Sequence, residues 1–201
     1  MKTKLTIIAA VAAAAMALQS TQATPITGVI GFSGTASLDS SVASSATEVT
    51  GWGNNFIGLH TGSFASLTGT ASVAFNSPWT FASSGLPSFW TITDSTGNYT
   101  FNLTSSKVFS TGSTTGPLGT TTSISILIFG TVVSTVAGLD ATAFTGSMTI
   151  QDPSVDNGTN PKTFSYTESL SFSPVPDGGT TVLLLGSALS GLALLRRKLS
   201  A

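Results

Sequence analysis

The sequence predicts an all-β fold, an antiparallel β-sandwich or jelly roll, placed between an N-terminal signal-peptide helix and a C-terminal transmembrane helix. Three observations carry this prediction. Apolar and polar residues alternate with a period of two through the middle of the chain, turn-forming residues separate the alternating runs, and an uncharged apolar segment stands near each end. We therefore divide the chain into a signal peptide (1–23), a β-sandwich body (24–174) and a C-terminal segment (175–201).

The first segment has the organisation of a secretory signal peptide. Lys2 and Lys4 form a basic n-region, and Leu5 to Leu18 is an apolar run of 14 residues, which is shorter than the ~20 residues that span a membrane. A polar stretch with small residues follows, and we place the cleavage site after Ala23. The segment is expected to engage the Sec translocon and signal peptidase. The alternative is a short amphipathic or core helix.

The body is expected to form about seven to nine short antiparallel strands around one core. Residues 124–133 are apolar on both faces and are expected to form a central strand, whereas turn chemistry predicts connections at 83–87, 94–98, 110–122 and 152–161. The apolar positions of the alternating runs include Ile30, Phe32, Ala36, Leu38, Ala71, Val73, Phe75, Tyr99, Phe101, Leu103, Phe144, Met148, Ile150, Phe164, Tyr166, Leu170 and Phe172.

The composition of the body excludes several classes of protein. Residues 24–177 hold two basic residues against eight acidic ones, a net charge of −6, so the body lacks the basic patch that nucleic-acid binding requires. The 55 serines and threonines there outnumber the ten charged residues, so hydroxyls provide most of the solubility. The chain has no cysteine, and its core must be stabilised by burial without disulfides.

Residues that could carry catalysis are sparse. The single histidine, His60, has no G-x-S-x-G nucleophile elbow to accompany it, and the acids are scattered without an evident pair of the kind that glycoside hydrolysis needs. We therefore expect no enzymatic activity and no cofactor.

Two further groups of residues are candidates for ligand contact. Trp79 and Trp90 flank a Ser/Gly/Pro loop and would stack on sugar rings if they were exposed, although core packing is the competing role. Asp152, Asp156 and Asn157 supply oxygen ligands within one loop and are candidates for Ca²⁺, although their spacing differs from that of an EF-hand and turn formation is the competing role.

The C-terminal segment has three parts in a fixed order: a short motif (175–179), an apolar stretch expected to be a transmembrane helix (180–195) and a basic end (196–198). The uncharged run from Gly178 to Leu195 has 18 residues, or roughly 27 Å of helix, which just crosses a ~30 Å hydrocarbon core. Pro176 and the residues after it break helical structure, so the motif is expected to be extended. The motif is Val175, Pro176, Asp177, Gly178 and Gly179, and the stop-transfer cluster is Arg196, Arg197 and Lys198.

The order of motif, apolar span and basic end resembles the PEP-CTERM class of exosortase-sorted bacterial proteins, and Val175 to Gly179 is most similar to its VPDSG-type variant. Gly178 departs from the serine usual in that variant. The resemblance implies recognition of Pro176 and Asp177 by an exosortase, and processing near the motif. A loosely similar run in the body, Gly97 to Leu103, also occurs in proteins of this class.

These observations predict an exported surface or extracellular-matrix protein, anchored in the membrane at least transiently and associated with exopolysaccharide. Basic residues at both chain ends fit a translocated body. A sortase signal would need L-P-x-T-G, and a GPI signal would lack the basic end. A permanent single-pass anchor stays open for the tail, and a carbohydrate-binding module or a secreted hydrolase stays open for the body.

Overall fold

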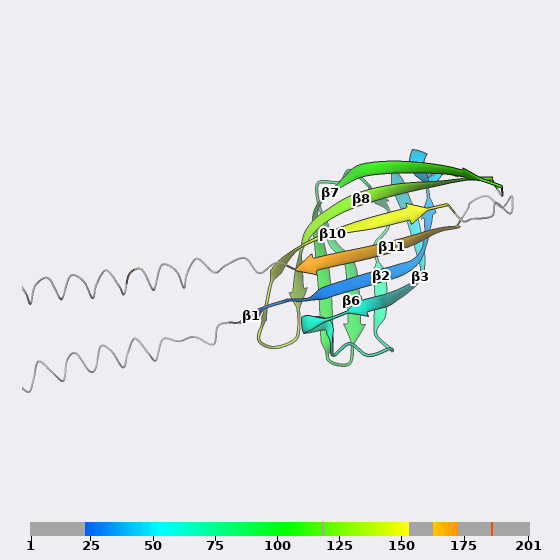
Figure 1. Ribbon diagram of the computed structural model, residues 1–201. Coiled ribbons are helices and arrows are strands. Elements are labelled where there is room, and N and C mark those ends of the chain that lie inside the picture. The colour runs from blue at the N-terminus through cyan, green and yellow to red at the C-terminus, as the bar shows by residue number, and fades with distance from the viewer. Residues whose placement is uncertain (1–22, 118, 153–162, 173–185, 187–201) are drawn as a thin grey trace, which may run out of the picture.

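The computed structural model describes residues 23–117, 119–152, 163–172 and 186, and within these ranges the chain is built almost entirely of β-strands (Figure 1). The strands follow one another with few and short helical turns between them. In chain order the described elements are β1 (Thr24–Pro25), β2 (Val29–Leu38), η1 (Ala43–Ser45), β3 (Glu48–His60), η2 (Gly62–Phe64), β4 (Ser72–Phe75), β5 (Trp79–Thr80), β6 (Leu86–Asp94), β7 (Gly97–Gly116), β8 (Gly119–Ser134), β9 (Leu139–Asp140), β10 (Thr142–Gln151) and β11 (Thr163–Phe172).

Nine of the described strands form one antiparallel sheet in the order β4-β6-β7-β8-β10-β11-β2-β3-β5, and β1 pairs with β9 in a separate parallel pair. The sheet curls until its two edge strands, β4 and β5, are joined by only Asn76 to Pro78. Trp52 on β3 donates its Nε1–H to the Asn76 carbonyl oxygen at 3.0 Å, and the Asn76 N–H donates to the Phe89 carbonyl oxygen on β6 at 2.7 Å. These bonds hold the two ends of the sheet together.

The prediction of an antiparallel all-β fold is confirmed, but the expected sandwich of two facing sheets is corrected to one curled sheet. The register of β2 against β3 shifts at three places, and such bulges increase strand twist. The resulting curl lets a single sheet surround the core.

No helix among the described residues is long and apolar enough to cross a membrane. The two helices expected at 1–23 and 180–195 lie outside the described residues except for Ala23 and Gly186.

Strand β11 shows how the alternating pattern builds the wall of the core. Its residues with odd numbers are all Ser or Thr and all exposed, whereas its residues with even numbers are all buried. Since successive side chains of a strand point to opposite faces, a hydroxyl on every second residue produces one wet face and one dry face. The buried set is Phe164, Tyr166, Glu168, Leu170 and Phe172.

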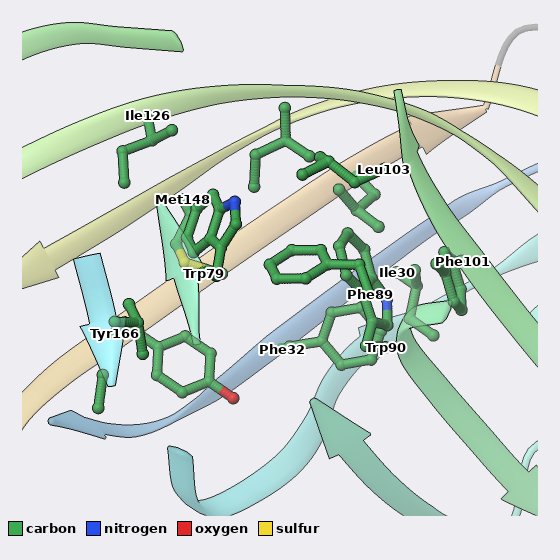
Figure 2. Packing of buried hydrophobic residues seen from close by; sticks show 14 of the residues in the cluster. Ile30, Phe32, Trp79, Phe89, Trp90, Phe101, Leu103, Ile126, Met148 and Tyr166 are labelled. Atoms are coloured by element: carbon green, nitrogen blue, oxygen red, sulfur yellow. The ribbon is translucent and has the colours of Figure 1, made fainter. Parts of the chain in front are cut away.

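Aromatic rings fill the middle of the core. Figure 2 shows Phe32, Phe89 and Trp90 meeting in the interior. The Trp90 ring stacks on Phe101 with centroids 5.0 Å apart and meets Phe89 edge-on at 4.6 Å. Offset stacks and edge-on pairs are the arrangements that ring quadrupoles favour. The core thus relies on large aromatic side chains, and the chain has no cysteine that could add a disulfide.

Strands β7 and β8 form a long hairpin that differs from expectation. Residues 110–122 were expected to be a connection, yet β7 continues to Gly116 and β8 begins at Gly119. Threonine is β-branched and favours extended structure, so this Thr-rich stretch pairs with itself despite its glycines. The prediction that 124–133 is a central strand is confirmed because β8 pairs with both β7 and β10, but its outer face is partly open, with Phe129 40% exposed.

The described body begins and ends on the same side (Figure 1). The Thr24 N–H donates to the Gly138 carbonyl oxygen at 2.7 Å, close before β10, and Phe172 pairs with Phe144 near the start of β10. The other end of β10, at Gln151, pairs with Ser123 of the β7–β8 hairpin. A strand of ten residues spans roughly 30 Å, so the hairpin tip lies at the far end of the body from both exits.

Candidate functional site

Most of the predicted sorting residues lie outside the described part of the chain, namely Val175, Pro176, Asp177, Gly178, Gly179, Arg196, Arg197 and Lys198. Ala23, after which we expect signal cleavage, is described and directly precedes β1. Thr24, the expected first residue of the mature chain, is already paired with Leu139 through the β1–β9 ladder.

The two tryptophans considered for sugar contact are core residues. Trp79 is 1% exposed and Trp90 is 0% exposed, so neither ring presents a face on which a sugar could stack. Trp79 instead stacks on the half-buried Trp52 with ring centroids 6.1 Å apart. The interpretation of these rings as sugar contacts is therefore not supported, and core packing explains both.

Asp152, considered as a calcium ligand, organises hydrogen bonds at the far end of the body. Its Oδ2 accepts from the Thr122 N–H at 2.8 Å and from the Thr122 Oγ1–H at 2.6 Å, and its Oδ1 accepts from the Ala43 N–H at 3.1 Å. The carboxylate thus joins η1 to β8. Its proposed co-ligands Asp156 and Asn157 lie outside the described residues, within which no cluster of three or more His, Cys, Asp or Glu side chains occurs.

Replacing Asp152 by alanine is expected to lower the free energy of unfolding by about 1–2 kcal/mol, because three donors lose a charged acceptor at a partly solvated site. Urea denaturation monitored by tryptophan fluorescence measures the change. The matched control is Gln151→Ala, an exposed neighbour, which is expected to change stability by less than about 0.5 kcal/mol. Equal stability of the Asp152→Ala variant and the unaltered chain would contradict the role assigned to this carboxylate.

A polar cleft of about 500 Å³ lies beside Asp152 at the same end of the body. The polar side chains that line the cleft carry hydroxyl, amide and carboxylate groups, and the backbone of the β7–β8 hairpin forms one wall. Such a lining offers these groups for hydrogen bonding, and two of its members are already joined, since the Thr122 hydroxyl donates to Asp152 at 2.6 Å. The lining residues are Gly112, Thr114, Thr121, Thr122, Ser123, Gln151, Asp152 and Ser165.

His60 and Asp94 each make local contacts within the described part of the chain. His60 ends β3 and its Nδ1 lies 3.1 Å from the Gly58 carbonyl oxygen. Asp94 shapes the β6–β7 turn, where hydrogen bonds from the hydroxyls of Thr68 and Thr96 lower the pKa of its carboxyl to about 2. Both groups thus have structural partners, which for Asp94 are the two threonine hydroxyls.

Sequence reasoning did not predict that Glu168 is a core residue. It is 4% exposed in the middle of β11, between Met148 of β10 and Phe32 of β2, and neither carboxyl oxygen has a hydrogen-bond partner among the described residues. Burial raises the pKa of this carboxyl well above its ordinary value. The period-two pattern places position 168 on the inward face of its strand, and this is the signal by which the buried carboxyl could have been predicted.

Comparison with known proteins bears on the C-terminal segment. Residues 174–199 match the family model of the VPDSG-CTERM motif. No curated protein and no solved structure matches the chain. The matched range begins two residues after β11 ends and includes the motif, the apolar stretch and the basic cluster. The chain therefore carries, behind an all-β body, a VPDSG-CTERM motif, which is a PEP-CTERM-like sorting signal and implies processing by an exosortase.

Proposed function

We propose that this chain is an exported, exosortase-processed protein of the cell surface or extracellular matrix, associated with exopolysaccharide and without catalytic activity of its own. The observation that carries the proposal is the VPDSG-CTERM motif at residues 174–199, which implies export toward the cell surface. The basic n-region and apolar run at residues 2–18 support entry into the Sec translocon at the other end of the chain.

The arrangement of the body supports the same function. The start of β1 and the end of β11 lie on one side of the described body (Figure 1), so the two segments expected to meet the membrane join the body on the same side. The hairpin tip and the polar cleft lie on the opposite side and would face away from the membrane before processing. An exposed surface rich in hydroxyls and poor in charge suits contact with hydrated polysaccharide.

The absence of catalysis is part of the proposal. The single histidine lacks an acidic or hydroxyl partner among the described residues, and Asp94 and Asp152 are engaged in turns and loop contacts. The alternative of a carbohydrate-binding module loses the two aromatic rings on which it rested, because Trp79 and Trp90 are buried.

Mass measurement of the exported product tests the sorting step. We expect the product to lack Leu199 to Ala201, because an exosortase would cleave near Pro176 and Asp177 and separate the tail from the body. The variant Asp177→Ala is expected to keep its tail and to accumulate in the membrane fraction. Gly178→Ser is the matched control, since it restores the V-P-D-S-G sequence and should be processed at least as completely.

An exported product of intact mature mass that includes Leu199 to Ala201 would contradict processing and favour a permanent single-pass anchor. Equal processing of the Asp177→Ala and Gly178→Ser variants would contradict the recognition of Asp177.

A further inference from the structure

One edge of β7 is open over a long stretch. β6 pairs with β7 only as far as Leu103, while β7 continues to Gly116. Beyond the contact of Ser106 with Ser83, no backbone partner among the described residues reaches this edge, and residues 109–116 are all exposed. An unpaired strand edge is a template for another strand, because its N–H and C=O groups are already aligned.

The register identifies which groups face the open side. Thr122 on β8 turns its backbone away from β7, since its carbonyl oxygen accepts from the Asp152 N–H at 2.8 Å and its N–H donates to the Asp152 carboxylate at 2.8 Å. Ser113 is paired with Thr122, so this pair is a non-hydrogen-bonded one and the backbone groups of Ser113 point outward. The ladder has no register shift from 110 to 116, and Thr111 and Thr115 therefore expose their backbone groups as well.

This edge lacks the usual protection against strand addition. Lys107 and the bulge between Val108 and Ser110 disfavour strand addition, but both lie at the end of the open edge nearest the body. Residues 110–116 contain no charge and no proline, and the hydroxyl side chains of the outward-bonding residues favour cross-strand pairing. The outward-bonding residues are Thr111, Ser113 and Thr115.

We propose that this edge pairs with the same edge of a second copy of the chain, giving an antiparallel two-fold dimer centred on Ser113. The sequence is self-complementary about that residue, because Thr111 of each copy would face Thr115 of the other and Ser113 would face its equivalent. Every outward N–H and C=O of this segment then has a partner and no charge is buried. A foreign strand lacks this symmetric match of hydroxyl to hydroxyl.

The position of the edge favours such pairing. The β7–β8 hairpin projects at the end of the body opposite to both exits, where no described strand obstructs an approaching copy (Figure 1). The dimer would therefore form without displacing β1 or β11, and it does not depend on whether the tail is processed.

Disulfide trapping of the full chain, purified in detergent, tests the proposal. The chain contains no cysteine, so Ser113→Cys introduces a single thiol. Paired equivalents in a hydrogen-bonded antiparallel pair have Cα atoms about 5.5 Å apart, within the range that a disulfide bridges. We expect mild oxidation to convert most of this variant to a species of twice the chain mass on non-reducing gels. The control Ser169→Cys is equally exposed, but its strand is paired on both edges, and it should yield several-fold less dimer.

Second-site variants separate strand pairing from random collision. Thr115→Pro, added to Ser113→Cys, removes an outward N–H without removing a ladder bond to β8, and it is expected to reduce trapping to the level of the control. Thr115→Ala keeps the N–H and should preserve trapping. Equal trapping at residues 113 and 169, insensitivity to Thr115→Pro, or a product whose mass is not twice that of the chain would each overturn the proposal.

Discussion

Replacing Glu168 by methionine is expected to stabilise the body, and to do so more strongly at pH 8 than at pH 5. The glutamate places two unpartnered carboxyl oxygens in the core among apolar neighbours. Removing an unsatisfied buried polar group is expected to raise the free energy of unfolding by about 1–3 kcal/mol, since methionine has a similar shape and no group that needs water.

The pH dependence follows from the raised pKa of Glu168. In the unfolded chain this carboxyl ionises near its ordinary pKa, whereas in the folded chain burial keeps it protonated to a higher pH. Stability is therefore full below the ordinary glutamate pKa and falls as the pH rises toward the folded-state pKa. Between the unfolded-state and folded-state pKa values of Glu168, the stability advantage of the methionine variant grows by about 1.4 kcal/mol for each unit of pH.

Urea denaturation at pH 5 and pH 8, with the full chain in detergent, measures both effects. Glu168→Gln is the matched control: it cannot ionise, so it should remove the pH dependence, but it keeps an unpartnered polar group and should gain less stability than methionine. His60 is common to all three proteins, and differences among them therefore belong to residue 168. A methionine variant less stable than the unaltered chain at both pH values would refute this account.

Truncation of Trp90 to alanine is expected to lower the free energy of unfolding by about 3–5 kcal/mol, the range found for large aromatic residues lost from cores. Trp90 is fully buried and its ring contacts Phe89, Phe101 and Phe144 from three different strands. Its removal leaves a void at the point where β6, β7 and β10 meet.

Trp90→Phe is the matched variant. It retains a ring at the centre of the cluster and removes the indole Nε1–H, which has no hydrogen-bond partner among the described residues. We expect this variant to lose clearly less stability than Trp90→Ala. The fluorescence of Trp52 and Trp79 reports unfolding in both variants. Equal losses would show that packing at Trp90 is not what stabilises the core.

The alternating pattern correctly predicted which strand residues point into the core. The inward positions on β2 and β11, such as Phe32 and Tyr166, are buried as expected. The pattern could not reveal that one curled sheet replaces two, because curvature arises from the β2–β3 bulges and from the Trp52 and Asn76 bonds between strands far apart in the sequence. The period-two pattern shows which side chains of a strand point inward, but it does not show which other strands they pack against.

Local composition misled at residues 110–122, where glycines suggested a connection. The pairing of two Thr-rich strands in one local hairpin outweighs that signal, since residues 110–116 pair in register with residues 119–125. The tail motif was predictable because recognition of a sorting signal rests on short local sequence, and the family match covers the same residues. Glu168 was not predicted: the alternation places its position on the inward face, but only the placed strand shows that its carboxyl is buried without a hydrogen-bond partner among the described residues.

The pairing of β2 with β11 determines when the sheet can be completed during synthesis of the chain. Ile30 is joined to Leu170 across 140 positions of sequence, and β10 needs β11 on its second side as well. Until residues 163–172 emerge, β2 and β10 each keep a bare edge and the sheet stays in two parts. The matched motif starts at residue 174, directly behind this last strand. Completion of the described sheet and arrival of the sorting signal are thus consecutive events, so a chain that presents its signal already contains every strand of that sheet.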